Sequence, residues 1–286
     1  MNRSMHLLLF LTVTLGACQV EERAPAAAPG ADAAVGLARF VPHDSLLPGG
    51  REGASIRRGR ALVLETRDSL PNLVGNQLNC TSCHLDGGIR ANAMPLVGVY
   101  ARFPQYRGRS GTVELMEDRI TDCFLRSMNG RPPERGSRDM RDMIAWFGWI
   151  SKDVPVGAAV PGQGMPQVAP LGPDTAAGER LFAIECVRCH GPNGEGTVIA
   201  PPVWGDGSYN IGAGMARIRT LAAFLRTNMP YDRQGTLTDQ QAYDLAAYIN
   251  SQPRPDFPGK ELDWPFGDPP PDVAYPTNAV RMRSTP

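Results

Sequence analysis

Apolar residues recur at helical spacing in short segments, which polar stretches rich in Pro and Gly separate from one another. The spacing predicts a helix over Ser55–Thr66, a second over Val113–Met128, and a third that begins at Ser137 or Asp139 and ends at Ile150. Strand-like alternation with period two is scarce. The pattern therefore predicts an all-α protein.

The second half of the chain repeats this succession of elements. Either Asp174 or Thr175 is placed to cap an opening helix. Thr238, with Gln241 three residues later, has the composition of a capping box before a last helix. The closing segments DMIAWFGWIS (142–151) and DLAAYINSQ (244–252) also resemble each other. We therefore expect an internal duplication.

Prolines and glycines mark the boundaries between segments. The chain has 27 Pro and 31 Gly among 286 residues, which indicates many loops. The Ala/Pro-rich stretch at 21–36 has too little apolar surface to fold. We expect a leader at 1–17, a tether at 18–52, a first domain at 53–152, a Pro/Gly linker at 153–173, a second domain at 174–254 and an extended C-terminal strap at 255–286.

The first residues are typical of an export signal. Arg3 precedes the apolar run Leu7–Leu15, which is too short to span a bilayer, and the run ends in the word LGAC. This word resembles a bacterial lipobox, so we expect lipidation at Cys18 and a protein anchored on the periplasmic side of a membrane. The alternative is ordinary cleavage nearby, with Cys18 incidental.

Net charge favours no nucleic-acid or membrane-surface partner, because Lys plus Arg and Asp plus Glu each number 29. Charge can still be local. One short region carries five arginines: Arg102, Arg107, Arg109, Arg119 and Arg126.

Four of the six cysteines form two C-x-x-C-H words, CTSCH and CVRCH. In this motif the thiols attach a haem covalently and the histidine becomes an iron ligand. A C-x-x-C pair alone also suits a redox dithiol or half a zinc site, but the adjacent histidine, present twice, favours haem. We predict two covalently bound haem c groups, held by Cys80, Cys83 and His84 and by Cys186, Cys189 and His190.

The second ligand of each iron is predicted from the repeat. Met229 lies 39 residues after His190, in a Met-Pro sequence of the kind that supplies the methionine ligand in small cytochromes c. Cys123 lies 39 residues after His84. If the two halves fold alike, Cys123 faces the first iron; otherwise it is a small buried hydrophobe.

Other residues compete for the first iron. Met128 is the main rival, followed by Met94 and Met140, although methionine is more often core filler than ligand. His43 is not excluded. A thiolate ligand donates electron density, so a haem bound by Cys123 should have a lower potential than one with His and Met ligands, and electrons should run from the first haem to the second.

Several words of the sequence resemble the diheme thiosulfate dehydrogenases. They are NCTSCHLDGG, VGVYARFPQYRGRSG, MEDRITDCFLRSMNGRP and RPDFPGKELDWPFGD, and the likeness extends over about 53–268. The resemblance implies two class I cytochrome c-like domains and the oxidation of two thiosulfate ions to tetrathionate, in some members reversed. It also implies an external acceptor, such as a small cytochrome c or an iron–sulfur protein.

The resemblance also implies roles for individual residues. His84 and Cys123 correspond to the ligands of the active-site haem, and His190 and Met229 to those of the electron-transfer haem. The residues expected around the catalytic cysteine are Arg107, Arg109 and Ser127, with Arg119 and Gln105 as further candidates. Some members carry a lysine just before the methionine; here Asn228 stands in that place, so no lysine at this position can exchange with the methionine.

Two alternatives to a thiosulfate dehydrogenase remain at this point. One is another sulfur-compound-oxidising diheme cytochrome, which the FPQYR segment and the tail disfavour. The other is a tethered diheme electron shuttle without substrate chemistry, in which Cys123 is merely structural.

Overall fold

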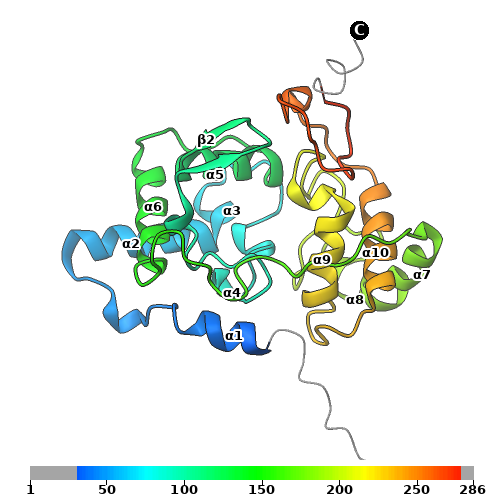
Figure 1. Ribbon diagram of the computed structural model, residues 1–286, viewed down its shortest axis with the longest axis horizontal. Helices are drawn as coiled ribbons and strands as arrows, with labels where there is room; N and C mark the ends of the chain where they lie inside the picture. The colour runs from blue at the N-terminus through cyan, green and yellow to red at the C-terminus, as the bar shows by residue number, and fades with distance from the viewer. Residues whose placement is uncertain (1–30, 278–286) are drawn as a thin grey trace, which may run out of the picture.

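The computed structural model describes residues 31–277, which form two helical domains lying side by side (Figure 1). The expected leader, the lipidation site Cys18 and the last nine residues of the strap lie outside the described residues. Within 31–277, no helix combines the length and the apolar character needed to cross a membrane.

The first domain consists of short helices around one two-stranded sheet. Its elements are α2 (Gly50–Leu64), α3 (Thr66–Ser69), η2 (Cys80–Ser82), α4 (Leu85–Gly88), η3 (Tyr100–Arg102), β1 (Gln105–Arg107), β2 (Thr112–Glu114), α5 (Met116–Asp122), the π-helical turn η4 (Cys123–Ser127) and α6 (Arg138–Ile150).

The second domain has fewer elements, and no helix comparable to α3 separates its first helix from its cysteines. Its elements are α7 (Thr175–Glu185), α8 (Val187–His190), η5 (Gly214–Ala216), α9 (Ile218–Asn228) and α10 (Asp239–Ser251), followed in the strap by η6 (Lys260–Leu262). The predicted fold class, all-α, is confirmed. The described residues contain one small exception, the antiparallel pair β1–β2, in which Tyr106 lies opposite Val113.

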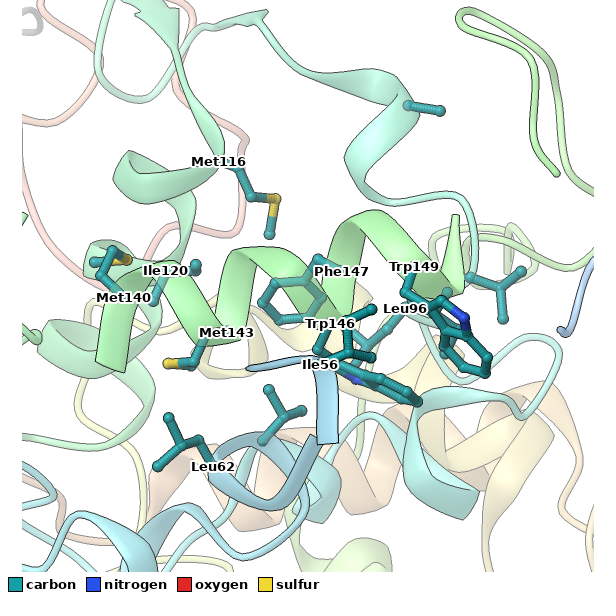
Figure 2. Packing of buried hydrophobic residues seen from close by; sticks show 14 of the residues in the cluster. Ile56, Leu62, Leu96, Met116, Ile120, Met140, Met143, Trp146, Phe147 and Trp149 are labelled. Carbon is teal, nitrogen blue, oxygen red and sulfur yellow. The ribbon is translucent and has the colours of Figure 1, made fainter. Parts of the chain in front are cut away.

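Helix α6 supplies much of the apolar core of the first domain (Figure 2). Met143, Trp146 and Phe147 lie on its buried face, and the Trp146 and Trp149 rings stack with centroids 5.2 Å apart. Met116 approaches this face from the helix that precedes Cys123. The same packing that builds the core therefore sets the position of α5.

The first and last helices of each domain cross closely at a glycine. A Cβ atom on Gly59 of α2 would lie 1.8 Å from the backbone oxygen of Asp142 in α6. A Cβ atom on Gly178 of α7 would lie 2.0 Å from the backbone oxygen of Asp244 in α10. Because only glycine fits at these two points, the crossings confirm that the halves are structural copies.

Three expected helix starts agree with the structure, whereas the helix expected over Ser55–Thr66 begins earlier, at Gly50, and ends at Leu64. Ser137 accepts a hydrogen bond from Met140 N, Asp174 accepts one from Ala177 N, and Thr238 forms the capping box with Gln241. The helix expected over Val113–Met128 is shorter than predicted, because its first residues belong to β2 and its last turn is π-helical.

The segment expected to be an unfolded tether is partly helical, and this prediction was wrong for its second half. Helix α1 (Ala31–Ala38) and the turn η1 (Asp44–Leu46) precede α2. Leu37 is only 1% exposed, and Phe40 and Val41 pack against the core of the first domain. A few apolar residues suffice because they add to an existing core rather than forming one.

The linker at 153–173 contains no helix or strand, and the strap at 255–277 contains only the short turn η6, but both are tied to the domains. In the linker, Val154 and Val160 are buried in the first core, whereas Met165 and Val168 pack against the second. The linker therefore helps to hold the two domains together.

The glycine crossings give a stability prediction. We expect Gly59→Ala and Gly178→Ala each to lower the free energy of unfolding by about 1–3 kcal/mol, because the new methyl group forces two backbones apart. Denaturant unfolding followed by circular dichroism measures this. The matched control is Gly148→Ala in α6, where no atom lies within 4 Å of the new Cβ and stability should be unchanged or higher. Wild-type stability in Gly59→Ala would contradict the close crossing.

Candidate active site

Both C-x-x-C-H histidines are fixed through one ring nitrogen. His84 Nδ1 lies 2.5 Å from the backbone oxygen of Met94, and His190 Nδ1 lies 2.7 Å from that of Pro201. When the Nδ1–H of an imidazole donates to a carbonyl, Nε2 is left without a proton and can bind a metal. The same hydrogen bond fixes the orientation of the ring. Two independent loops thus prepare two histidines in the same way.

The second domain contains a cavity of about 650 Å³. Cys186, Cys189, His190 and Met229 line it, as does Met215. This volume lies within the roughly 300–1,000 Å³ of pockets that bury organic ligands. The volume, the two thiols and the oriented imidazole together fit a covalently attached haem with Met229 as a further iron ligand.

The first domain contains a smaller cavity of about 80 Å³. The thiols of its C-x-x-C-H word, His84 and Cys123 line it, together with Arg119, Ser127 and Met128. Its donor set fits haem c as well as the second set does. Its volume does not hold a porphyrin, so the surrounding side chains must separate to admit one.

The two cavities share part of their walls. Leu78 and Cys83 line both of them. The other residues around the second cavity come mainly from α8 and the loops and helices of the second domain, but the first domain also contributes Thr81, Ser82, Leu85 and Asp86. A group bonded to Cys83 would therefore lie against the wall of the neighbouring cavity. This proximity suits electron transfer between two centres.

Cys123 and Met229 occupy equivalent places. Cys123 is the residue immediately after α5, and Met229 is the residue immediately after α9. The spacing of 39 residues thus reflects a shared structural frame. Cys123 differs in opening a π-helical turn, a local departure from the α-helix that is frequent at functional sites.

Burial sets the protonation of the thiols and imidazoles. It raises the pKa of Cys80, Cys83 and Cys186 to about 12, and it lowers the pKa of His84 to about 4. Burial also lowers the pKa of His190. Both imidazoles are therefore neutral at neutral pH, which is the form that binds a metal.

Arg119 and Ser127 line the same cavity as Cys123. The Cys123 sulfur is the largest influence on Arg119 and raises the pKa of its guanidinium. Ser127 lies one turn beyond Cys123 and lines the same cavity. Among residues 31–277, no carboxylate forms an ion pair with Arg119, so its donors are available to an anion.

Gln105 and Arg107 lie on β1, outside the cavity lining. Arg107 Nη1 lies 3.4 Å from Gln105 Oε1, and its Nε lies 4.0 Å from Glu114. Burial lowers the pKa of Arg107, and the positive charge of Arg119 lowers it further. Arg107 therefore adds positive potential near Cys123 without lining its cavity.

Arg109, which was predicted to lie beside the cysteine, does not line the cavity of Cys123. Its Nη1 donates to the backbone oxygen of Gly212 at 2.7 Å, and its guanidinium lies 5.0 Å from the centre of the Trp264 ring. Burial lowers its pKa to about 10. Arg109 joins the first domain to the second domain and the strap.

The rival ligands are accounted for by their positions. Met128 lines the first cavity and is 2% exposed, so it remains adjacent to Cys123. Met140 is buried in the core and does not line the cavity, and Met94 supplies its backbone oxygen to His84. His43 is exposed and caps η1, accepting a hydrogen bond from Ser45 N.

A buried ion pair near Cys123 was not predicted from the sequence. Arg126, three residues after the cysteine, makes two hydrogen bonds of 2.7 Å to Asp263 in the strap. The two residues are 137 positions apart, so no local pattern could have paired them. The only signal was the arginine cluster in which Arg126 lies.

Comparison with known protein families agrees with this architecture. The SoxA/TsdA cytochrome c domain model matches residues 74–156, and the model described as cytochrome c oxidase, cbb3-type, subunit III matches residues 173–249. The fold and the two ligand sets therefore define a two-domain c-type cytochrome.

Relatives identify its family. The chain is 43% identical to a thiosulfate dehydrogenase of Psychrobacter arcticus over 87% of its length and 78% of the relative's, and 44% identical to one of Allochromatium vinosum over 77% and 86%. The chain belongs to the thiosulfate dehydrogenase family. A solved thiosulfate dehydrogenase (TsdBA) from Marichromatium purpuratum aligns with a TM-score of 0.73 and 38% identity over 77% of this chain, which spans half of that solved chain.

Proposed function

We propose that this chain oxidises two thiosulfate ions to tetrathionate and passes the two electrons to an external acceptor. The observation that carries the proposal is the convergence of Cys123, Arg119 and Ser127 on a cavity that also contains a C-x-x-C-H set. The curated relatives, named thiosulfate dehydrogenases, support the choice of substrate. An electron shuttle has no need of an unpaired arginine beside a cysteine.

Two covalently bound haem c groups are part of this proposal. Cys80, Cys83 and His84 would hold the first, with Cys123 as the further iron ligand. Cys186, Cys189, His190 and Met229 would hold the second. When bound, the haems supply one-electron acceptors that together take the two electrons of the reaction.

Charge complementarity accounts for substrate binding. Thiosulfate is a dianion whose sulfonate oxygens accept the paired donors of a guanidinium. In the proposal Arg119 binds these oxygens, the Ser127 hydroxyl adds a further donor, and Arg107 contributes long-range attraction. Arg109 is left out of the binding set because Gly212 and Trp264 occupy its guanidinium.

The chemistry at sulfur balances with Cys123 as the reacting group. The Cys123 thiolate and the outer sulfur of one thiosulfate form an S–S bond with loss of two electrons. The outer sulfur of a second thiosulfate then attacks the substrate-derived sulfur of that bond. This attack releases tetrathionate and regenerates the thiolate, as in thiol–disulfide exchange.

The location and the electron acceptor are also proposed. The apolar leader and the LGAC word support export to the periplasmic side and anchoring through lipid at Cys18. The acceptor would be a small cytochrome c or an iron–sulfur protein that reaches the second haem. The balanced charge of the chain supports the absence of a nucleic-acid partner.

The haem count has a direct test. The mature protein should carry a mass increment of two haem groups, and the double variant Cys186→Ser/Cys189→Ser should retain one, because its thiols no longer attach a porphyrin. Mass spectrometry of the denatured protein measures both values. A single haem in the wild type would refute the two-haem proposal.

Catalysis by Cys123 is tested by replacement with glycine. We expect Cys123→Gly to lose nearly all tetrathionate formation from thiosulfate with ferricyanide as acceptor, because the reacting sulfur is gone, while both haems are retained. The wild type assayed in parallel is the control. Equal turnover in both proteins would remove Cys123 from the mechanism, and no turnover in either would direct the work to the reverse reaction and then to a shuttle.

The anion-binding role of Arg119 predicts a defect in substrate use. Arg119→Met should lower kcat/KM for thiosulfate about 10- to 100-fold, as expected for losing a charged hydrogen bond worth roughly 1.5–3 kcal/mol. Steady-state kinetics measure this. The matched control is Arg60→Met, which removes an exposed pair with Asp44 and does not touch the cavity of Cys123. An equal loss in both variants would point to stability rather than substrate binding.

A further inference from the structure

The π-helical turn that begins at Cys123 is held from outside its own domain. A π-helical turn ends with carbonyl groups that need partners. Asn210 of the second domain donates its side-chain amide to Leu125 O at 2.9 Å and its backbone N–H to Arg126 O at 3.1 Å. Asn76 donates to Ser127 O at 2.8 Å. The second domain thus determines part of the shape of this turn.

The side chain of Arg126 provides a second, stronger attachment. Its two terminal nitrogens bind the two oxygens of Asp263 at 2.7 Å each, and the residues are 8% and 5% exposed. Paired bonds of this kind fix both the distance and the orientation of a guanidinium. The Phe257 ring, 4.2 Å from the guanidinium carbon, closes one face.

Asp263 is itself held in place by the strap. Tyr275 donates its hydroxyl to Asp263 Oδ2 at 2.6 Å. The next residue, Trp264, donates its N–H to Arg109 O at 2.7 Å, so the strap is also fixed to the first domain beside β1. The strap returns to the second domain where Asp272 accepts from Arg219 N at 2.8 Å. Asp263 therefore sits on a segment attached at both ends.

We propose that Asp263 is a positioning residue for Cys123, acting through Arg126 to set the π-helical turn and thereby the direction of the cysteine sulfur. This inference rests on the proposed function, in which Cys123 is the reacting sulfur and a haem ligand. Arg126 and Asp263 touch no substrate in this account. Their effect is on where the sulfur lies relative to His84 and Arg119, across the same cavity.

The test uses full-length holo-protein with Asp263→Asn, which keeps the side-chain size and removes the charge. We expect kcat for tetrathionate formation to fall about 10- to 100-fold, as for a reacting group displaced by about 1 Å, with KM changed less. The sulfur–iron charge-transfer absorption of the first haem should shift or weaken, while the absorption of the second haem stays unchanged.

The matched control is Asp142→Asn, the same change at a buried aspartate of the first domain that pairs with Arg58 and lies outside the cavity of Cys123. We expect it to lower stability without altering kcat or the charge-transfer band. Unchanged kcat and band in Asp263→Asn would overturn the proposal, as would equal changes in the control.

A milder variant covers the case in which Asp263→Asn does not fold. Tyr275→Phe removes one hydrogen bond to Asp263 and leaves the ion pair, so it should shift the same two measurements in the same direction, with kcat about two- to fivefold lower. No change in either measurement would then overturn the proposal. If the wild type shows the charge-transfer band but forms no tetrathionate, the proposed function is refuted. The positioning role of Asp263 would still be tested, by comparing that band in the wild type and the variants.

Discussion

Each domain depends on the close crossing of its first and last helices at a glycine. The crossing brings α2 against α6 and α7 against α10, and it leaves the intervening chain to surround a cavity. In each domain the C-x-x-C-H word follows the first helix. Cys123 follows α5, and Met229 follows α9. A small domain with little core of its own can be stable around such a frame when an apolar prosthetic group completes it.

The repeat made much of this architecture predictable from sequence. The 39-residue spacing predicted the place of Cys123 because both domains have the same number of residues between the C-x-x-C-H histidine and the residue that follows α5 or α9. Arg109 could not be placed, because the direction of a side chain on a short hairpin depends on what packs against it. The partner in that case is Gly212, more than a hundred residues away.

The segments that flank the two domains depend on distant partners in the same way. Composition identified 21–36 as poor in apolar surface, yet Leu37 just beyond it is buried against the first core. The strap looked featureless because its important residues, such as Asp263, take their meaning from distant partners. Local patterns predict elements well, but they do not contain the long-range pairs that complete a site.

The contact of Asn210 with the turn of Cys123 has a consequence for how such chains can diversify. The first domain is not structurally independent, because two carbonyl groups in the turn of Cys123 accept hydrogen bonds from Asn210 of the second domain. Recombination that exchanged the second domain alone would have to preserve this asparagine. The two domains are therefore expected to have changed together. The first domain could specialise in sulfur chemistry only while the second domain kept the donor groups that complete the turn of Cys123.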